Sequence, residues 1–225
     1  MDRNITKEEI AEGYDKIVDK IGLAAEFYDE VLGFHKKYYG NILDIGCGRG
    51  FLLKKLEEKA GIGSRFFGLD ISPKLCSIAK ENNPNSEIMR GDAENLPFED
   101  DFFDFVFMTE VLEHLLDYGK GLREARRVLK KNGVFIVSAP NRDWLQYDFY
   151  DKIRNKNLQP VDDYYFRFEE IKSHLENNGF KVLNYRGLDN LFYYGKIHKL
   201  ELFAAFFLPF LRKKMKRLLF KCVKI

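Results

Sequence analysis

The sequence contains few cysteines. Its 225 residues include three of them, Cys47, Cys76 and Cys222, which lie far apart and form no C-x-x-C pair. Zinc sites and disulfide frameworks need cysteines grouped at short, regular spacings. The pattern therefore suggests neither a zinc site nor a disulfide-stabilised secreted fold, and it is typical of a reducing compartment.

Long apolar segments and a secretory signal are also lacking. The first ten residues, MDRNITKEEI, are polar and of mixed charge, unlike a signal peptide. The longest apolar stretch, residues 202–211, is too short to span a bilayer and contains a proline. The formal net charge of +2 is too small to imply nucleic-acid binding by itself. We expect a cytoplasmic protein.

What the sequence does contain is an alternation of strand and helix patterns. Short apolar runs predict strands at residues 41–45, 65–70, 86–92, 102–109, 134–140, 181–188 and 216–225. Apolar residues at helical spacing predict helices at residues 7–21, 23–37, 51–60, 72–82, 118–131 and 168–178. The alternation predicts a doubly wound, mostly parallel α/β sheet, whose ligands bind at the carboxyl ends of the strands.

Local signals mark several helix ends. Thr6, with Glu9 three residues later, has the sequence of a capping box. Ser72 can cap the helix that follows it, and Pro73 suits the first helical position. Gly179 suits the position that follows a helix.

A glycine-rich turn follows the first predicted strand. Residues 42–50 read ILDIGCGRG, with glycines at positions 46, 48 and 50. A dinucleotide-binding turn, G-x-G-x-x-G, would place its third glycine at position 51, where this chain has Phe51. A P-loop would end in Gly-Lys-Ser/Thr, which this turn does not contain. The turn therefore favours neither a nicotinamide dinucleotide nor a nucleoside triphosphate.

As D-x-G-x-G-x-G, this turn resembles motif I of the class I S-adenosylmethionine-dependent methyltransferases. Later segments resemble further motifs of that family in the same order: GLDIS, GDAENLPF, FDFVFMTEVLEHL and EARRVLKKNGVFIVSAPN. Several motifs in one order are far more specific than any one of them. The resemblance, over roughly residues 40–185, implies a Rossmann-like seven-stranded sheet of order 3-2-1-4-5-7-6, with six parallel strands and one antiparallel strand.

The resemblance implies S-adenosylmethionine as the cofactor and gives roles to residues at the strand ends. Asp44 is expected near the amino group of the cofactor, and Asp70 at its ribose hydroxyls. Asp92, with the Ala93 amide beside it, is expected at the adenine. Each acid alone could instead be a strand-end, helix-capping or turn residue, but all of them in this order favour cofactor binding. The other expected cofactor-binding residues are Tyr14, Gly46, Cys47, Gly48, Gly50, Ile71 and Thr109.

Candidate catalytic residues follow the fourth predicted strand. Glu110, Glu113 and His114 would share one face if this segment is helical. A base is needed only if the acceptor loses a proton, as a hydroxyl does, so His114 is either a general base or a hydrogen-bonded structural residue.

The same residues also resemble a metal-binding cluster. Similar E-x-x-E-H clusters bind a divalent metal in small-RNA 2′-O-methyltransferases, together with a later histidine. Here the corresponding region, residues 160–170, offers Asp162 and Asp163 but no histidine. We therefore assign no metal site.

We expect one methyltransferase domain over residues 1–225, with three accessory segments. Residues 1–39 form a helical cap, residues 141–165 an aromatic-rich, lid-like insertion, and residues 195–215 an amphipathic helical insertion before the last strand. Basic residues directly follow the apolar part of this last insertion. Residues 200–217 therefore either contact an anionic membrane or pack on the core with a solvated basic end.

The predicted function is methyl transfer from S-adenosylmethionine to a small-molecule acceptor. An oxygen nucleophile is preferred, and the acceptor is lipophilic if the membrane interpretation holds. The alternative is a metal-assisted RNA 2′-O-methyltransferase, which only the basic cluster at Arg212 supports, and nucleic-acid partners are not expected. The strand-end acids disfavour a non-catalytic binding module, and Phe51 disfavours a nicotinamide oxidoreductase.

Overall fold

A computed structural model describes most of the chain, namely residues 5–19, 23–144, 147–148, 160–161, 164–188 and 209–225. The strands are β1 (Asn41–Ile45), β2 (Arg65–Asp70), β3 (Glu87–Arg90), β4 (Phe103–Thr109), β5 (Leu129–Pro140), β6 (Phe180–Leu188) and β7 (Arg217–Lys224). The helices are α1 (Lys7–Ile17), α2 (Ala25–Leu32), α3 (Phe51–Lys59), α4 (Pro73–Asn82), α5 (Tyr118–Val128) and α7 (Phe168–Asn177), with 3-10 helices η1 (Leu112–His114) and η2 (Pro209–Lys214).

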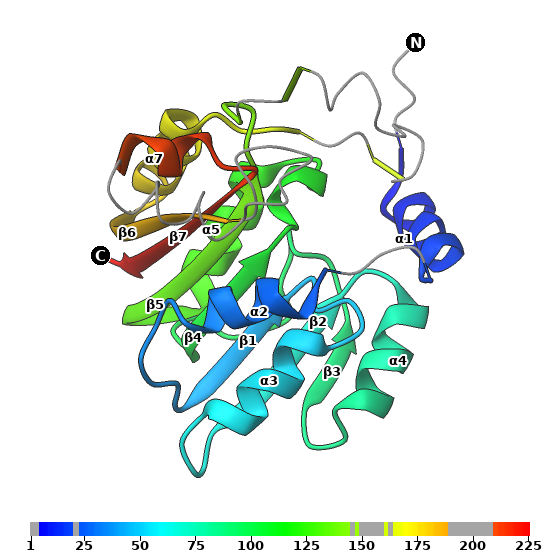
Figure 1. Ribbon diagram of the computed structural model, residues 1–225. Helices are drawn as coiled ribbons and strands as arrows, with labels where there is room; N and C mark the ends of the chain where they lie inside the picture. The colour runs from blue at the N-terminus through cyan, green and yellow to red at the C-terminus, as the bar shows by residue number, and fades with distance from the viewer. Residues whose placement is uncertain (1–4, 20–22, 145–146, 149–159, 162–163, 189–208) are drawn as a thin grey trace.

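The strands form one seven-stranded sheet in the order β3-β2-β1-β4-β5-β7-β6 (Figure 1). The pairs among β1, β2, β3, β4 and β5 are parallel. β7 runs antiparallel to both of its neighbours, β5 and β6. The predicted strand order, with six parallel strands and one antiparallel strand, is confirmed.

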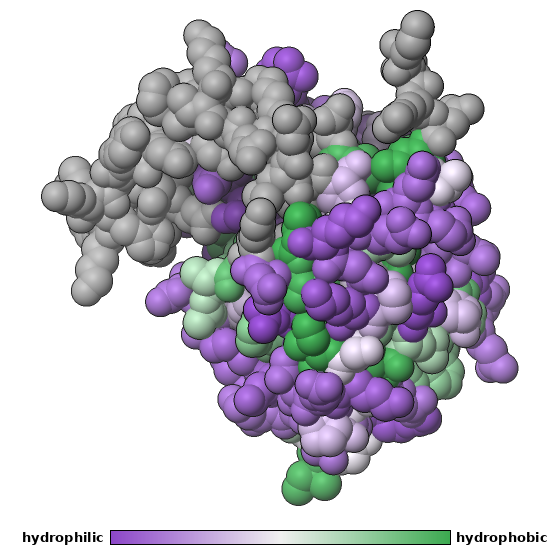
Figure 2. Space-filling model, turned by 90° about the vertical axis from the view of Figure 1, so that its right-hand side faces the viewer, coloured by the Kyte–Doolittle hydropathy of each residue, from purple (hydrophilic) through white to green (hydrophobic). Residues whose placement is uncertain are grey.

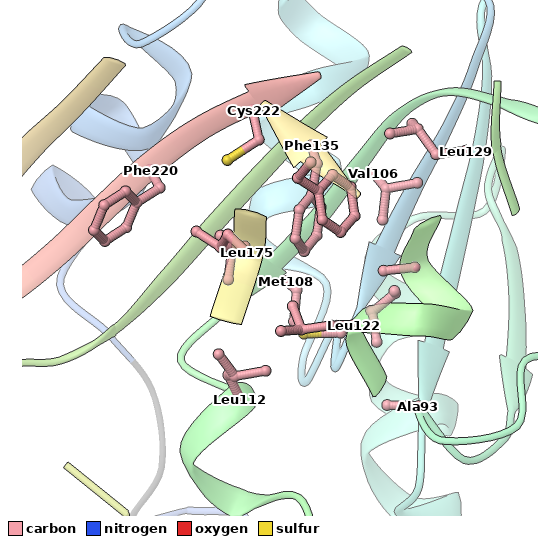
Figure 3. Packing of buried hydrophobic residues seen from close by; sticks show 14 of the residues in the cluster. Ala93, Val106, Met108, Leu112, Leu122, Leu129, Phe135, Leu175, Phe220 and Cys222 are labelled. Carbon is pink, nitrogen blue, oxygen red and sulfur yellow. The ribbon is translucent and has the colours of Figure 1, made fainter. Parts of the chain in front are cut away.

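Both faces of the sheet are buried under helices. Along β1, Ile42 belongs to the core beneath α2, α3 and α4, whereas Leu43 belongs to the core beneath α5 and α7. Phe105 and Val106 of β4 divide in the same way between the two cores. Figure 3 shows part of the second core, including Val106, Met108, Leu122, Phe135, Leu175 and Phe220. Burial on both faces explains why β4 is almost entirely apolar.

Several predicted helix ends are confirmed. Thr6 caps α1 in a capping box with Glu9. Ser72 caps α4 through a hydrogen bond to the Leu75 N–H, and the helix begins with a proline. Gly179 follows α7 in the left-handed conformation, with φ of 79°. These ends form as expected because each depends on neighbouring residues only.

The second helix is shorter than predicted. The periodicity predicts a helix over residues 23–37, but α2 ends at Leu32. The Gly33 N–H there donates to the carbonyl of Asp29. The chain then bends, and the Tyr38 hydroxyl donates to the Leu32 carbonyl at 2.9 Å. The buried residues Phe34 and Tyr38 therefore reach the core from a turn and not from the helix.

The fifth strand begins earlier than predicted. α5 ends at Val128 instead of residue 131, because Leu129 already pairs with Phe103 of β4. The Asn132-Gly133 turn lies inside β5, with Asn132 at φ of 62°. The β4–β5 register shifts at this point, so the predicted turn is a bulge within the strand.

The accessory segments are described only in part. The lid-like insertion has gaps within residues 145–163, and the amphipathic insertion lies outside the described residues up to residue 208. Within the described ranges, no helix is long and apolar enough to cross a membrane. Figure 2, seen from the side of α1 and α4, shows a mainly hydrophilic surface with small, separate groups of hydrophobic residues. That side is typical of a surface that faces water.

His35 is a half-buried titratable group that packs against aromatic rings of the core at the amino end of the sheet. Its ring centroid lies 5.1 Å from that of Phe105 and 5.6 Å from that of Tyr38. Its Nδ1 is buried without a hydrogen-bond partner among the described residues. Burial, followed by the charge of Lys221, lowers the pKa of His35 from its ordinary 6.5. The unfolded chain therefore binds this proton more readily than the native protein does.

We expect His35→Phe to remove a pH-dependent loss of stability. As the pH falls from about 7 to 5, the wild type should lose free energy of unfolding relative to the variant, because unfolding protonates His35. Asp44 and Asp70, whose raised pKa values act with the opposite sign, are present in both proteins and cancel. Urea unfolding across this range measures the difference, and Tyr39→Phe should follow the wild type. A difference that does not change with pH would contradict the prediction.

Candidate active site

The carboxyl ends of β1, β2 and β4 open into a cavity of about 480 Å³, a size typical of small-molecule sites. The predicted catalytic residues Glu110, Glu113 and His114 line it. Gly50 does not line this cavity. The predicted cofactor-binding residues that do are Tyr14, Asp44, Gly46, Cys47, Gly48, Asp70, Ile71, Asp92, Ala93 and Thr109. The fold thus brings almost every predicted site residue to one place.

The glycine turn after β1 forms one wall of the cavity. Gly46, Gly48 and Gly50 all have positive φ, and the Gly46 N–H donates to the Leu69 carbonyl of β2 at 2.7 Å. A Cβ on Gly50 would lie 2.1 Å from Asn83 Nδ2, so packing against α4 requires glycine there. At Gly48 a Cβ would meet nothing within 4 Å. Gly48 therefore lets the backbone itself border the cavity.

Asp70 is oriented by two backbone donors. The Gly48 N–H donates to Oδ2 at 2.8 Å, and the Ser72 N–H donates to Oδ1 at 3.0 Å. Burial raises the pKa of Asp70, while these two hydrogen bonds lower it. Each carboxylate oxygen keeps a second acceptor direction, so Asp70 has the capacity for the ribose hydroxyls predicted to bind there.

Two polar atoms beside the glycine turn, Asp44 Oδ1 and Arg49 Nε, are buried without a hydrogen-bond partner among the described residues. Both residues line the cavity. Burial, and then the charge of Asp70, raises the pKa of Asp44 well above its ordinary value, so a cation beside Asp44 would be favourable. A carboxylate and a guanidinium together complement the ammonium and carboxylate groups of an α-amino acid. The residues present therefore fit the methionine part of S-adenosylmethionine.

Asp92 lies where α1 meets the core. It accepts a hydrogen bond from the Glu94 N–H at 2.9 Å and pairs with Lys7 Nζ at 3.2 Å. Lys7 also pairs with Glu94 at 2.5 Å. These contacts hold α1 against the cavity, which Ile10 and Tyr14 of the same helix line. Asp92 thus shares its carboxylate with Lys7, and its contact with adenine stays a prediction.

The segment after β4 is not an α-helix, so the condition under which Glu110, Glu113 and His114 would share one helical face is not met. Glu110 adopts a positive φ of 55°, and Val111 also lies outside the helical region. A 3-10 turn then covers only Leu112–His114. The turn places His114 Nε2 3.8 Å from Glu113 Oε1. All three residues line the cavity: Glu113 and His114 lie together as a pair, and Glu110 lies apart from them.

The separate acid, Glu110, contacts residues of two other strands. Its Oε1 accepts a hydrogen bond from Ser138 Oγ at 2.8 Å. Its Oε2 faces Arg217 Nε at 2.5 Å. The Glu110 side chain is 14% exposed and that of Arg217 is 19% exposed, so the ion pair is largely shielded from water.

Residues without an assigned role in the sequence complete the far end of the cavity. Tyr28 of α2 also lines the cavity but lies beside the glycine turn, with its ring centroid 6.2 Å from that of Phe51, and burial followed by the Asp44 carboxylate raises its pKa to about 12. Lys216 and Arg217 belong to the basic cluster for which the sequence predicts contact either with a membrane or with solvent. Trp144 and Tyr165 belong to the aromatic-rich insertion, residues 141–165. The aromatic content of that insertion is the sequence feature that pointed to this end of the site.

The geometry gives no support to the metal-assisted RNA alternative. Within the described ranges, no group of three or more His, Cys, Asp or Glu side chains is arranged to hold a metal ion. Glu110, one of the residues that resemble the metal-binding E-x-x-E-H cluster, is paired with Arg217. Cys47, at the cavity wall, is free, and burial raises the pKa of its thiol well above the ordinary value.

Comparison with known proteins agrees with this site. Residues 43–137 match the family model described as a methyltransferase domain. The chain is 32% identical over 174 residues to an uncharacterized protein of Methanocaldococcus jannaschii, covering 77% of this chain and 80% of that protein. It is 31% identical over 142 residues to a probable S-adenosylmethionine-dependent methyltransferase of Mycolicibacterium smegmatis, covering 63% and 52%.

Two further likenesses concern a named enzyme and the fold. The chain is 35% identical over 105 residues to the demethylmenaquinone methyltransferase of Staphylococcus haemolyticus, covering 45% of this chain and 44% of that protein. A crystal structure of an S-adenosylmethionine-dependent methyltransferase from Thermotoga maritima shares the fold. Its TM-score is 0.70 at 20% identity, and the match covers 96% of this chain and 100% of that one.

The chain belongs to the class I S-adenosylmethionine-dependent methyltransferases. It is therefore an enzyme whose cofactor, S-adenosylmethionine, supplies a methyl group on a sulfonium leaving group. Asp44 and Arg49 would hold the amino-acid end of the cofactor, and Asp70 its ribose. The matched region spans about half the length of each relative with a named activity, 52% and 44%, so their acceptors do not carry over.

We expect the two ends of the cofactor to be separable by mutation. Asp44→Asn and Arg49→Met should each weaken binding of S-adenosylhomocysteine by about 1–3 kcal/mol, because each leaves a buried ligand group unpaired. Neither should change binding of methylthioadenosine, which lacks the amino acid. Asp70→Ala should weaken both ligands, because both contain the ribose. Calorimetric titration of each ligand measures these effects, and equal losses for both ligands in the Arg49 variant would exclude the amino-acid assignment.

Proposed function

We propose that the protein methylates an oxygen atom of a small-molecule acceptor. The observation that carries the proposal is the Glu113–His114 pair at the cavity wall. A hydroxyl acceptor must lose its proton as the oxygen attacks the methyl group, and a histidine can accept that proton. A carboxylate beside the histidine stabilises the imidazolium that forms.

The surroundings of the pair support this role. The Glu113 side chain is 4% exposed and that of His114 is 17% exposed, so little water separates the two charges. The Tyr14 ring meets the His114 ring edge-on, with centroids 6.1 Å apart. The Tyr164 N–H donates to the Glu113 carbonyl at 3.0 Å. Two elements distant in sequence thus position the pair.

The boundaries of the cavity support a small acceptor. α1 is fastened at one end by the Lys7–Glu94 ion pair and at the other by Ser72 Oγ, which donates to Asp15 Oδ1 at 2.5 Å. A helix fastened across the site leaves little room for a macromolecule. The relative named demethylmenaquinone methyltransferase is named for a small lipophilic molecule. The aromatic lining of the far end likewise supports an acceptor with a flat apolar body.

Membrane contact is not part of this proposal, whereas a cytoplasmic location is. Among the described residues of the basic cluster, Lys213 pairs with Glu169 at 2.7 Å, and Lys214 lies 4.0 Å from Asp143. Their charges are therefore partly compensated within the fold. Residues 200–208, which carry the apolar part of the membrane interpretation, lie outside the described residues.

His114→Asn tests the base. We expect it to lower kcat for hydroxyl acceptors by about 10²–10⁴-fold and to remove the low-pH limb of the kcat profile, because Asn cannot accept the proton. Release of S-adenosylhomocysteine with a panel of phenols and alcohols measures turnover. His174→Asn, outside the cavity, should keep wild-type kcat. Unchanged kcat in His114→Asn would make His114 a structural residue, and turnover with amines alone would exclude oxygen as the nucleophile.

A further inference from the structure

Two consecutive cations, Lys216 and Arg217, line the cavity where β5 and β7 meet, on the other side of β4 from the strand that precedes the glycine turn. They are brought there by β7, whose first residue, Arg217, pairs with Pro140 at the end of β5. Lys216 Nζ lies over the Trp144 ring, 5.8 Å from its centroid. The acceptor end of the site therefore combines positive charge with an aromatic wall.

Arg217 is fixed in position from several directions. Its Nε lies 2.5 Å from Glu110 Oε2, and its guanidinium carbon lies 5.6 Å from the centroid of the Phe27 ring. Glu110 is itself held by Ser138 Oγ at 2.8 Å and by a backbone with a positive φ, which a non-glycine residue adopts at a cost. Glu110 thus acts as a positioning residue for the guanidinium.

A guanidinium held in this way is suited to one ligand chemistry. Arg presents several N–H donors in a planar fork that matches the two oxygens of a carboxylate, and pre-orientation lowers the entropy lost on binding. The low exposure of Arg217 strengthens such a contact. Lys216 adds a second positive charge at the same end. Neutral acceptors would gain nothing from these charges.

We propose that the acceptor carries a carboxylate, which Arg217 binds with Lys216 beside it, while the flat apolar body of the acceptor packs against Trp144 and Tyr165. The acceptor is thus a hydroxylated aromatic acid, or another flat apolar acid. This assignment rests on the proposed function, since it places the acceptor in the same cavity. It gives Glu110 a part in acceptor selection: its negative charge limits how strongly Arg217 attracts an acid.

The test measures binding, not turnover, in the complex with S-adenosylhomocysteine. The probes are hydroxylated aromatic carboxylates, each matched with its primary amide: vanillate with vanillamide, and caffeate with caffeamide. Calorimetry should show the acids binding the wild type at least about tenfold more tightly than the amides, a gap of about 1.4 kcal/mol. Glu110→Gln should widen the gap, because it removes the negative charge that lies 2.5 Å from Arg217 Nε. The double variant Glu110→Gln, Arg217→Gln should narrow it to what Lys216 alone contributes.

The matched control is a second arginine that pairs with a glutamate and lies over a phenylalanine ring, outside the cavity. Arg186 lies 2.8 Å from Glu30 and over the Phe34 ring at 5.1 Å. Arg186→Gln should leave the gap between acids and amides unchanged. Titration with S-adenosylhomocysteine checks that each variant is folded.

Three results would overturn the carboxylate assignment: equal affinity for acids and amides, a gap as wide in the double variant as in Glu110→Gln, or no binding by any acid. None of these would refute oxygen methylation, because the experiment involves no methyl transfer. Conversely, acids that bind as expected but are never methylated would leave the carboxylate contact standing and remove the proposed reaction.

Discussion

The hydrogen bond from the Gly48 N–H to Asp70, 2.8 Å long, is the contact on which the cofactor end of the site depends. It joins the turn after β1 to the end of β2, two strand ends that parallel pairing has already placed side by side. Asp70 is 7% exposed, and its pKa is raised by burial, so the carboxylate needs donors from the protein. The glycine turn supplies one without placing a side chain in the cavity.

The same end of the site is costly for the fold without its ligand. Asp44 and Arg49 each leave a buried polar atom unpaired among the described residues, and the pKa of Asp44 is raised by burial and by Asp70. The two apolar cores on either side of the sheet offset this cost. A ligand that pairs both atoms binds only the native state, so cofactor binding and stability are coupled. The buried groups of Asp44 and Arg49 therefore lower the stability of the unliganded protein and raise its affinity for the cofactor.

The sequence predicts the cofactor half of the site better than the acceptor half, for a physical reason. The glycine turn and the strand-end acids depend on residues next to one another in the chain, and the parallel sheet brings their ends together. Glu110 lines the cavity as predicted, but the helical spacing considered for it does not form, because its backbone adopts a positive φ. Arg217 was missed because its contact with Glu110 spans 107 residues. Basic residues near the end of a chain carry no local signal of such a contact.

The direction of β7 explains how Arg217 reaches the site at all. In a parallel strand, the last residues lie at the carboxyl edge of the sheet, where ligands bind. Because β7 runs antiparallel to β5, its first residues lie at that edge, and Arg217 pairs with Pro140. The segment Lys216–Arg217 is therefore brought to the proposed acceptor end, whereas the proposed cofactor end uses residues that follow β1, β2, β3 and β4 and residues of α1. Changes in this segment can alter which acceptor binds without disturbing the hydrogen bond between Gly48 and Asp70.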